Sequence, residues 1–407
     1  MGPIIAIVGG GLFTPRLCEA LAQAIDLPEV ELRLSARRQE RLRIIANHSA
    51  RRLAPARPGW SVQPALSLEA ACEAASIIIL LVRVGGLEAR AWDEAFPRQF
   101  GLVGDEGLGP GGVANAWRTV PELATIARTI KQVAPTTRIV NLMAPLGVTT
   151  RLLLDRGLDA IGLCELPLVT LKSWMTQPEL AGGLESWHYG GLNHLGWYWD
   201  VRCRGQDVLR LVADHPVDDG APIDRVTLDR YGAAPLRYFY EVFDREAGRR
   251  LKLERSAHRA AELSGLTETL IRRFAESPGG DIPEAEARRT PWLDQAAAPI
   301  VSALLGGSAH RGFANLRNDG KMSELPTDIV VEVPITVSSD GIRPVSPGPL
   351  PDRVRKFLHQ AAHSESLSFQ ASEQRDPALL IEAIRALPLS IPEVAVQELA
   401  TLAQRSS

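Results

Sequence analysis

A run of five apolar residues, Ile4-Ile5-Ala6-Ile7-Val8, leads directly into the glycine triplet Gly9-Gly10-Gly11. Such a run is typical of a strand that is buried on both faces. The glycines predict a tight turn in which the backbone can come close to a ligand. Apolar residues at helical spacing follow over positions 15–24, and the N-terminus of a helix favours the charge of a pyrophosphate. We therefore expect a dinucleotide site at the triplet, with Thr14 beside it.

The alternation of strands and helices continues outward from this turn. Strands are expected at 4–8, 30–34, 76–82, 138–142 and 160–163, with helices at 15–24, 38–52 and 120–133. This pattern predicts a parallel sheet covered on both faces. Residues 1–165 are therefore expected to form a doubly wound, Rossmann-like α/β domain.

The pattern changes beyond residue 165. Strands are expected at 187–201 and 329–337, and helices at 244–275, 294–305, 352–371 and 377–387. We predict an α+β domain over residues 166–407 that binds substrate and metal and mediates oligomerisation, in an arrangement like that of lactate and malate dehydrogenases. Turn-forming residues concentrate at 276–283, which predicts a surface loop or a mobile lid.

Composition excludes several classes of protein. The 407 residues carry a net charge of −3 without a basic cluster, so no nucleic-acid partner is expected. The apolar run at 77–82 is too short to span a membrane, and the first residues lack the charged segment of a signal peptide. Four scattered cysteines do not make a disulfide framework. We expect a cytoplasmic enzyme, a homodimer or homotetramer, that acts on a small molecule.

The end of the second expected strand bears on the choice of cofactor. An Asp or Glu usually binds the ribose hydroxyls of NAD there, but this chain reads Leu32-Arg33-Leu34-Ser35-Ala36-Arg37-Arg38. Ser35 with Arg37 or Arg38 would suit a ribose 2′-phosphate, which makes NADP a competitor of NAD. The alternative is that the arginines belong to a solvated helix start.

Eight segments in order carry a resemblance to a known family. They are Gly9-Gly10-Gly11 with Thr14-Pro15, Arg83-Val84-Gly85-Gly86-Leu87, Phe100-Gly101-Leu102-Val103-Gly104-Asp105-Glu106 with Gly109-Pro110-Gly111-Gly112, Ile161-Gly162-Leu163-Cys164-Glu165-Leu166-Pro167, Tyr189-Gly190-Gly191-Leu192-Asn193-His194-Leu195, Leu236-Arg237-Tyr238-Phe239-Tyr240, Asn315-Leu316-Arg317-Asn318-Asp319-Gly320 and Leu325-Pro326-Thr327-Asp328. Together they resemble glycoside hydrolase family 4, and its 6-phospho-β-glucosidase branch is the nearest.

The resemblance implies a mechanism unlike that of two-carboxylate glycosidases. The nicotinamide cofactor takes hydride from C3 of the sugar, and the new ketone acidifies the proton at C2. A base removes that proton, the C1 substituent leaves, water adds to the enone, and hydride returns to C3. A divalent metal, usually Mn²⁺, polarises the C2 and C3 oxygens.

The resemblance also implies the site residues. Cys164 and His194 map to the metal ligands, although a cysteine after a strand is by itself more often a buried apolar residue. Asn193 would contact substrate or metal-bound water. The remaining assignments are Arg83 to the cofactor and Glu106, Asn141, Arg288 and Arg317 to the substrate.

Four departures from the family pattern fall in the expected active site. Pro235 occupies the position of the catalytic Tyr, Ala144 replaces a substrate-binding Asn, and Glu165 stands after the metal Cys where Asn is common. The segment that is associated with the sugar phosphate reads Arg288-Arg289-Thr290-Pro291-Trp292, without the usual glycines.

These departures leave several functions open. Tyr238 is the first candidate for the base, since it lies about one helical turn beyond Pro235, and Tyr231 is the second. A sulfonate at C6, as in NAD-dependent sulfoquinovosidases, needs fewer donors than a phosphate and could be held by Arg288 or Arg289. A neutral glycoside, a sugar dehydrogenase and an inactive sugar or nucleotide sensor are further alternatives.

Overall fold

The computed structural model describes residues 2–9, 11–177, 180, 183–214, 225–244, 248, 259–287 and 290–405. Six parallel strands form its first half, in the order β3-β2-β1-β4-β5-β6. Their bounds are β1 Ile4–Val8, β2 Val30–Ser35, β3 Trp60–Pro64, β4 Ile77–Leu80, β5 Arg138–Asn141 and β6 Ala160–Gly162. The predicted doubly wound sheet is confirmed, and β3 is a strand that the sequence analysis missed.

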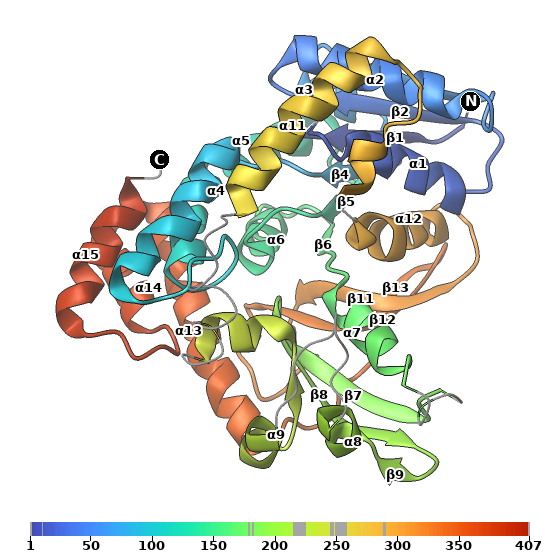
Figure 1. The fold of residues 1–407 in the computed structure, drawn as a ribbon. Helices are drawn as coiled ribbons and strands as arrows, with labels where there is room; N and C mark the ends of the chain where they lie inside the picture. Colours follow the sequence, from blue (N-terminus) through green and yellow to red (C-terminus); the bar gives the residue numbers. More distant parts are fainter. Residues whose placement is uncertain are drawn as a thin grey trace.

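Helices cover both faces of this parallel sheet (Figure 1). Alternate residues of β1 point to opposite faces: Ile5 and Ile7 pack in one core with α1 and α2, whereas Ala6 and Val8 pack in another with α3, α5 and α6. These helices are α1 Thr14–Ala24, α2 Gln39–Leu53, α3 Leu68–Cys72, α4 Gly86–Ala95, α5 Gly109–Val133 and α6 Leu146–Asp155. Burial on both faces explains why the strands read as continuous apolar runs.

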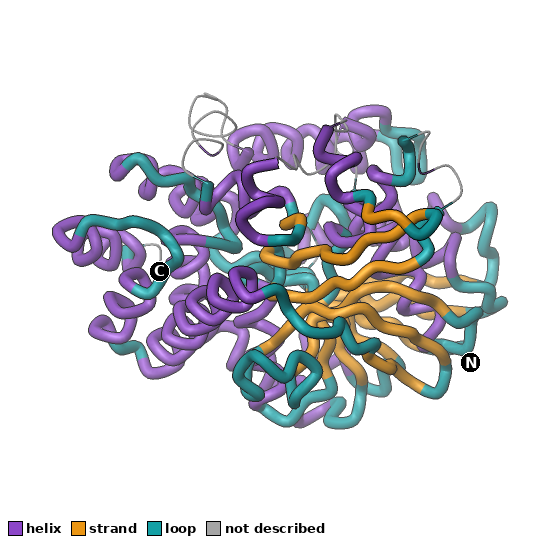
Figure 2. The backbone as a smooth tube through the Cα atoms, turned by 90° about the horizontal axis from the view of Figure 1, so that it is seen from below, coloured by secondary structure: helices purple, strands orange, loops and turns teal. Residues whose placement is uncertain are grey.

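The sheet continues without a break into the second half of the chain. Asn315 of β11 pairs antiparallel with Gly162 of β6, and the order then runs β11-β12-β7-β8-β10. The additional strands are β7 Ser186–Leu192, β8 Leu195–Cys203, β9 Gln206–Asp207, β10 Ala234–Pro235, β11 His310–Arg317, β12 Val330–Ser338 and β13 Gly341–Pro344. Figure 2 shows these strands fanning out as one twisted sheet. The strand direction changes after β6, close to the domain boundary predicted at residue 165, which stays a prediction.

The helices of the second half surround the antiparallel part and the C-terminal side. They are α7 Leu166–Trp174, α8 Leu209–Asp214, α9 Arg225–Tyr231, α11 Arg259–Glu276, α12 Ala298–Leu304, α13 Asp352–Gln374, α14 Pro377–Arg385 and α15 Glu393–Gln404. Helices α13 to α15 pack with α5 on the C-terminal side (Figure 1). The expected 187–201 strand is a hairpin of β7 and β8, and of the expected 244–275 helix most of residues 245–258 lies outside the described residues.

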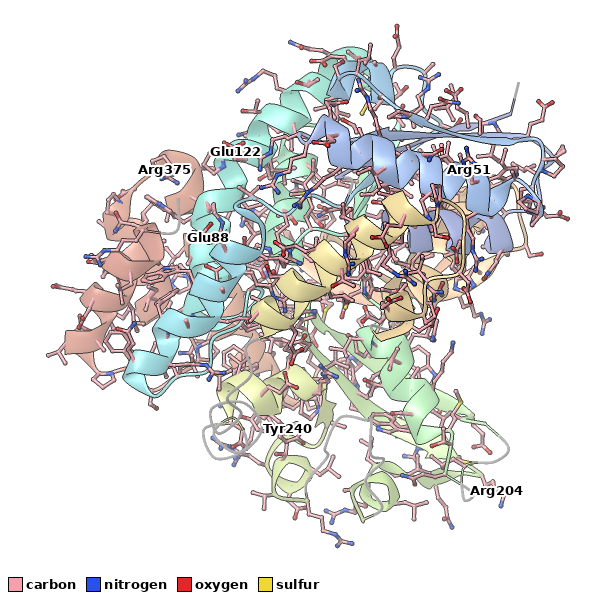
Figure 3. The ribbon with its side chains drawn as sticks, turned by 45° about the horizontal axis from the view of Figure 1, so that its top comes forward. Arg51, Glu88, Glu122, Arg204, Tyr240 and Arg375 are labelled. Carbon is pink, nitrogen blue, oxygen red and sulfur yellow. The ribbon has the colours of Figure 1, made fainter. Side chains whose placement is uncertain are left out.

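Helix α11 crosses over α2 and α4, and the loop after it is held against α2 (Figures 1 and 3). The Gly279 N–H donates to Nδ1 of His48 over 3.1 Å, and Asp281 pairs with Arg52 at 3.4 Å. Ile282 is buried. Of the two expectations for 276–283, these contacts favour an anchored surface loop over a mobile lid.

No helix among the described residues is both long and apolar enough to cross a membrane. The four cysteines are buried and free.

Candidate active site

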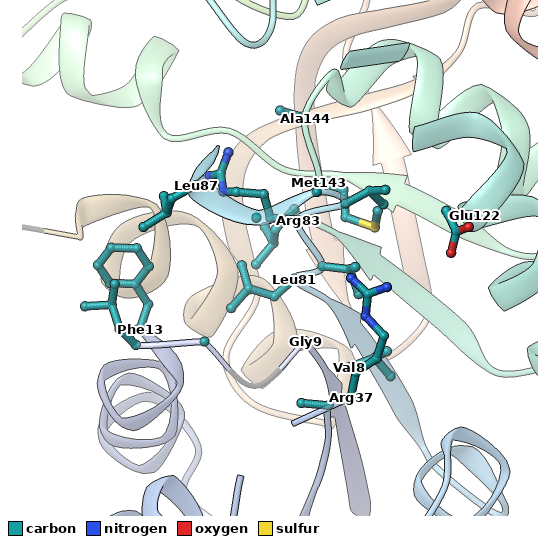
Figure 4. Close-up of a pocket in the computed structure, with 18 of the residues that line it drawn as sticks. Val8, Gly9, Phe13, Arg37, Leu81, Arg83, Leu87, Glu122, Met143 and Ala144 are labelled. Carbon is teal, nitrogen blue, oxygen red and sulfur yellow. The ribbon is translucent and has the colours of Figure 1, made fainter. Parts of the chain in front are cut away.

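A cavity of about 1100 Å³ runs along the carboxyl ends of the parallel strands. Its wall includes Val8 at the end of β1, Ser35 at the end of β2, Arg83 after β4 and Cys164 after β6. In Figure 4, Arg37 lies beside Val8 and Gly9, and Arg83 lies between them and Ala144. Open α/β sheets bind ligands at this edge, and the volume exceeds the usual range for a small-molecule site. The cavity therefore has room for a dinucleotide and a second ligand.

The glycine turn lies on the cavity wall. Gly9 has a φ of +110°, and a Cβ there would lie 2.4 Å from the backbone oxygen of Leu81, so only glycine fits. The Gly9 N–H donates to the carbonyl of Ser35 over 2.8 Å, which joins the turn to the end of β2. Gly11 also lines the cavity and faces open space. Gly10 lies outside the described residues.

Thr14 does not line the cavity. It is fully buried at the start of α1, and its hydroxyl has no hydrogen-bond partner within the described part of the chain. Thr14 is therefore not placed to contact a cofactor in the cavity directly, and its assignment stays a prediction.

Four of the other expected cofactor residues line the cavity. Ser35, Arg37 and Arg38 lie at its β2 end, and Arg83 lies farther along. Arg83 forms an ion pair with Glu106, which also pairs with Arg90 over 2.9 Å. The residues assigned to cofactor and to substrate are thus joined in one charged group. Glu106 is consequently held in place before any ligand binds.

The two expected metal ligands come together from opposite halves of the sheet. Cys164 stands two residues beyond β6, and His194 belongs to the two-residue turn between β7 and β8. Both line the same cavity. His194 has a φ of +64°, which is uncommon for a residue with a side chain and costs about 1 kcal/mol or more. A strained backbone at a cavity wall is consistent with a functional role for His194.

The charges around this pair suit a metal ion. Burial, reinforced by Arg237, lowers the pKa of His194 to about 4 against the opposing effect of Asp105, so its imidazole is neutral near pH 7. Its Nδ1 atom is buried and has no hydrogen-bond partner within the described residues. Burial and the nearby carboxylates of Glu165 and Glu332 raise the pKa of the Cys164 thiol. A divalent cation would satisfy the imidazole and offset the surrounding negative charge.

The metal site would be open. Within the described residues, no group of three or more His, Cys, Asp or Glu side chains is placed to hold a metal ion. Cys164, which would lose its proton on binding a metal, and His194 would supply one sulfur and one nitrogen ligand and leave coordination positions for sugar oxygens and water. These two residues therefore fit a catalytic metal better than a structural one.

A buried carboxylate that sequence reasoning missed supports the turn that carries His194. Glu332 of β12 is fully buried and accepts hydrogen bonds from the Tyr189 hydroxyl at 2.5 Å, the Asn315 amide at 2.8 Å and the Asn193 amide at 3.1 Å. Burial raises the pKa of Glu332 to about 7, although the three donors act in the opposite direction. Asn193 lines the cavity, as expected, and Glu332 fixes its orientation.

A second cluster that sequence reasoning missed ties three cavity loops together. The Asn115 amide on α5 donates to the carbonyls of Glu106 at 2.8 Å and Ala144 at 3.2 Å. Arg118, one turn farther along, donates to the carbonyl of Val84 at 3.1 Å and to Asn115 at 3.0 Å. A buried ion pair with Asp93 at 2.7 Å holds Arg118 in turn. Helix α5 thus fixes the relative positions of the loops on which Arg83, Glu106 and Ala144 stand.

Two of the expected substrate residues have structural roles elsewhere. Asn141 is fully buried: its side-chain N–H groups donate to the hydroxyls of Thr149 and Thr150, and its side-chain oxygen Oδ1 accepts the Met143 N–H. Arg317 pairs with Asp155 and donates to the carbonyl of Asp328. Neither lines the cavity, so their placement does not support a substrate contact, and both assignments stay predictions.

The arginines expected to hold an anionic C6 group lie outside the described residues. These are Arg288 and Arg289. Trp292 of the same segment does line the cavity.

The two candidate bases have different surroundings. Tyr231 packs among Trp197, Phe239 and Phe357, and it does not line the cavity. Its placement does not support a role as base. Tyr238 lies face to face with His194, but it too is absent from the cavity wall. Burial and the charge of Asp105 raise the pKa of Tyr238 far above its usual value, which disfavours the phenolate.

Models of one protein family match most of the chain. The model of the Family 4 glycosyl hydrolase matches residues 4–177, and that of the Family 4 glycosyl hydrolase C-terminal domain matches residues 189–390. The 6-phospho-beta-glucosidase BglT of Thermotoga maritima is 28% identical, with 96% of this chain and 94% of that protein covered.

Solved structures match the fold over nearly the whole chain. The 6-phospho-beta glucosidase from Thermotoga maritima with manganese, NAD+ and glucose-6-phosphate gives a TM-score of 0.86 at 24% identity, covering 99% of this chain and 98% of that one. A lactate dehydrogenase from a deep-sea metagenome library gives a TM-score of 0.54 at 13% identity, covering 91% of this chain and 99% of that one. The expected lactate dehydrogenase-like arrangement is confirmed.

Proposed function

The chain belongs to family 4 of the glycosyl hydrolases, and from this premise we propose that it cleaves a glucoside by transient oxidation of the sugar. One observation carries the proposal: a single cavity joins the glycine turn at Gly9 to the pair Cys164 and His194. Transient oxidation of a sugar by this route needs a dinucleotide next to a polarised sugar oxygen. The glycine turn at Gly9 can hold the dinucleotide, and a metal at Cys164 and His194 can polarise the oxygen.

Different residues along the cavity bind the cofactor, the metal and the sugar. The turn at Gly9 and Gly11 receives the pyrophosphate of a nicotinamide cofactor. Cys164 and His194 hold a divalent metal, and Asn193 orients the sugar from the same turn. When bound, the cofactor accepts and returns hydride while the metal acts as a Lewis acid on the sugar oxygens. Because hydride returns to the sugar, the reaction consumes no cofactor.

Burial keeps His194 in the neutral form that can bind a metal, and hydrogen bonds fix the residues beside it. His194 stays neutral because burial lowers its pKa to about 4, so it can offer a lone pair at any pH near neutrality. Glu332 holds Asn193 through a hydrogen bond of 3.1 Å. The loops that carry Arg83 and Glu106 are fixed by Asn115 and Arg118 of α5. The protein thereby presents a preorganised wall to the sugar.

A 6-phospho-β-glucoside is the first substrate to consider, because the Thermotoga maritima relative is named for that activity. A glucoside with a sulfonate at C6 is the alternative, since the arginine segment at 288–292 lacks the usual glycines. Buried free cysteines are consistent with work in a reducing compartment such as the cytoplasm. We also propose a homodimer or homotetramer.

Chromogenic glycosides test the proposed function directly. The protein is incubated with Mn²⁺, NAD or NADP, and the nitrophenyl derivatives of a 6-phospho-β-glucoside, a sulfoquinovoside and a plain β-glucoside. Release of nitrophenol without lasting absorbance of reduced cofactor supports the proposal and identifies the C6 group. Net reduction of cofactor would indicate a sugar dehydrogenase instead, and ligand binding without turnover would indicate a sensor.

A further inference from the structure

We propose that the cavity selects NADP(H) over NAD(H), with Ser35, Arg37 and Arg38 receiving the ribose 2′-phosphate. The inference rests on the proposed function, because it specifies the cofactor that the same cavity holds. It goes beyond the relatives, since the matching solved structure is described with NAD+.

The end of β2 lies where the adenosine ribose of a dinucleotide must lie. Ser35 pairs with Val8 in the register of β1 and β2, and its carbonyl accepts the Gly9 N–H. The pyrophosphate turn and the end of β2 are therefore in contact. In dinucleotide-binding folds of this type, the residues at the end of the second strand bind the ribose 2′ substituent.

The cavity-lining side chains that come from the end of β2 and the start of α2 are positive or neutral. Residues 35–39 and Arg41, in the first turn of α2, line the cavity without contributing a carboxylate. A carboxylate is the usual partner of a free 2′-hydroxyl, whereas an Arg accommodates a 2′-phosphate. A phosphate monoester carries about −1.5 to −2 charges at pH 7 and forms its strongest bonds with guanidinium groups.

These guanidinium groups are available for a ligand. Across the described ranges, no hydrogen bond or ion pair links the guanidinium group of Arg37, Arg38 or Arg41 to another residue, although the backbone carbonyl of Arg38 accepts the Leu42 N–H. The arginines near the other end of α2 behave differently: Arg51 donates to Asn47 at 3.3 Å, and Arg52 donates to Glu19 at 3.2 Å. A solvated helix start would leave arginines exposed, but it would not explain why three of them converge on the cavity beside Ser35.

Calorimetric titration of the purified full chain with NADP+ and with NAD+ tests the inference. We expect NADP+ to bind at least tenfold more tightly, which corresponds to about 1.4 kcal/mol. Double substitution of Arg37→Ala and Arg38→Ala should remove most of this preference by weakening NADP+ at least tenfold while changing NAD+ less than threefold. Arg43→Ala is the matched control, because Arg43 is an exposed arginine of α2 that does not line the cavity, and it should change neither affinity.

A second variant tests the same point by gain of function. Ser35→Asp places a carboxylate beside the 2′ position and should invert the preference in favour of NAD+. Tighter binding of NAD+ by the parent protein, or equal losses for both cofactors in the double variant, would overturn the 2′-phosphate assignment while leaving the proposed function intact. Failure of the parent to bind either cofactor would refute the proposed function as well.

Discussion

The imidazole of His194 lies flat against the phenol ring of Tyr238, with the ring centroids 4.2 Å apart and the planes 4° apart. His194 occupies a strained position in the turn between β7 and β8, with a φ of +64°. The stacked ring of Tyr238 supports the imidazole from the side. This placement fits a positioning role for Tyr238 better than the role of proton acceptor that its position in the sequence suggested.

Substitutions of Tyr238 separate these two roles. Tyr238→Phe keeps the ring, so Mn²⁺ affinity should stay within about twofold of the parent and deuterium exchange at C2 of a bound sugar should persist. Tyr238→Ala removes a contact worth roughly 1 kcal/mol and should weaken Mn²⁺ about fivefold. Tyr231→Phe, in the aromatic cluster away from the cavity, serves as the control. Loss of C2 exchange in Tyr238→Phe with unchanged metal affinity would instead identify Tyr238 as the base.

The metal pair can be tested by binding alone. The double variant Cys164→Ser and His194→Ala removes both proposed ligands and should abolish stoichiometric Mn²⁺ binding, measured by electron paramagnetic resonance of the free ion. Cys203→Ser is the matched control, because Cys203 is also a buried free thiol but lies outside the cavity. Metal stoichiometry that survives in the double variant would place the site elsewhere.

Glu332 should contribute strongly to stability because three donors converge on it. Removal of a buried acceptor leaves its donors unsatisfied at about 1–3 kcal/mol each. Glu332→Ala should therefore lower the free energy of unfolding by about 3 kcal/mol or more in urea titrations. Glu324→Ala is the comparison: Glu324 is half-buried and accepts the Leu350 N–H at 2.9 Å, so a loss of about 1 kcal/mol is expected. Equal losses in the two variants would show that the Glu332 network does not form as described.

The loop at 276–283 should loosen in acid because it depends on a neutral histidine. Burial lowers the pKa of His48 below its usual value of about 6.5, and its Nδ1 accepts the Gly279 N–H. Since the folded-state pKa is the lower one, the stabilisation is complete above the unfolded pKa and is lost as the pH falls through the folded pKa.

Hydrogen exchange reports this change. Protonation at Nδ1 removes the acceptor, at a cost of about 1 kcal/mol. The Gly279 amide should then exchange about fivefold faster in acid than at pH 7, after correction for the intrinsic rate. His48→Gln keeps an acceptor that does not titrate, and its exchange should show no such step. An identical step in that variant would rule out His48 as the cause.

The sequence predicted the structure best where the deciding residues are neighbours in the chain. The strand, the glycine turn and the arginines after β2 are contiguous, so their positions in the fold followed from their order. Helix α5 was predicted from residue 120, but it begins at Gly109. Its first turn is rich in glycine because a Cβ at Gly111 would lie 2.4 Å from the carbonyl of Asp105, and this crowding is invisible in the sequence.

Long-range contacts account for the errors at the site. Cys164 and His194 were paired by resemblance, and the structure places them on one cavity. Glu332 was missed because nothing in the sequence around a single acidic residue on a strand indicates that it is buried. Its role depends on hydrogen-bond donors from β7, β11 and the turn before β8. The surroundings of Asn141 could not be predicted because an Asn after a strand can face either a ligand or the hydroxyls of the next helix, and here its amide donates to Thr149 and Thr150.

The central claim is that the glycoside is oxidised and re-reduced in one cavity, and labelling at C2 tests it most directly. The hydrolysis is run in D₂O with Mn²⁺ and the preferred cofactor, and the released sugar is analysed by NMR and mass spectrometry. Removal of the C2 proton before the C1 substituent leaves requires that the proton returns from solvent when water adds. We expect deuterium at C2 of the product, with no net reduced cofactor at 340 nm. A product that retains hydrogen at C2 would show direct hydrolysis and would contradict the account.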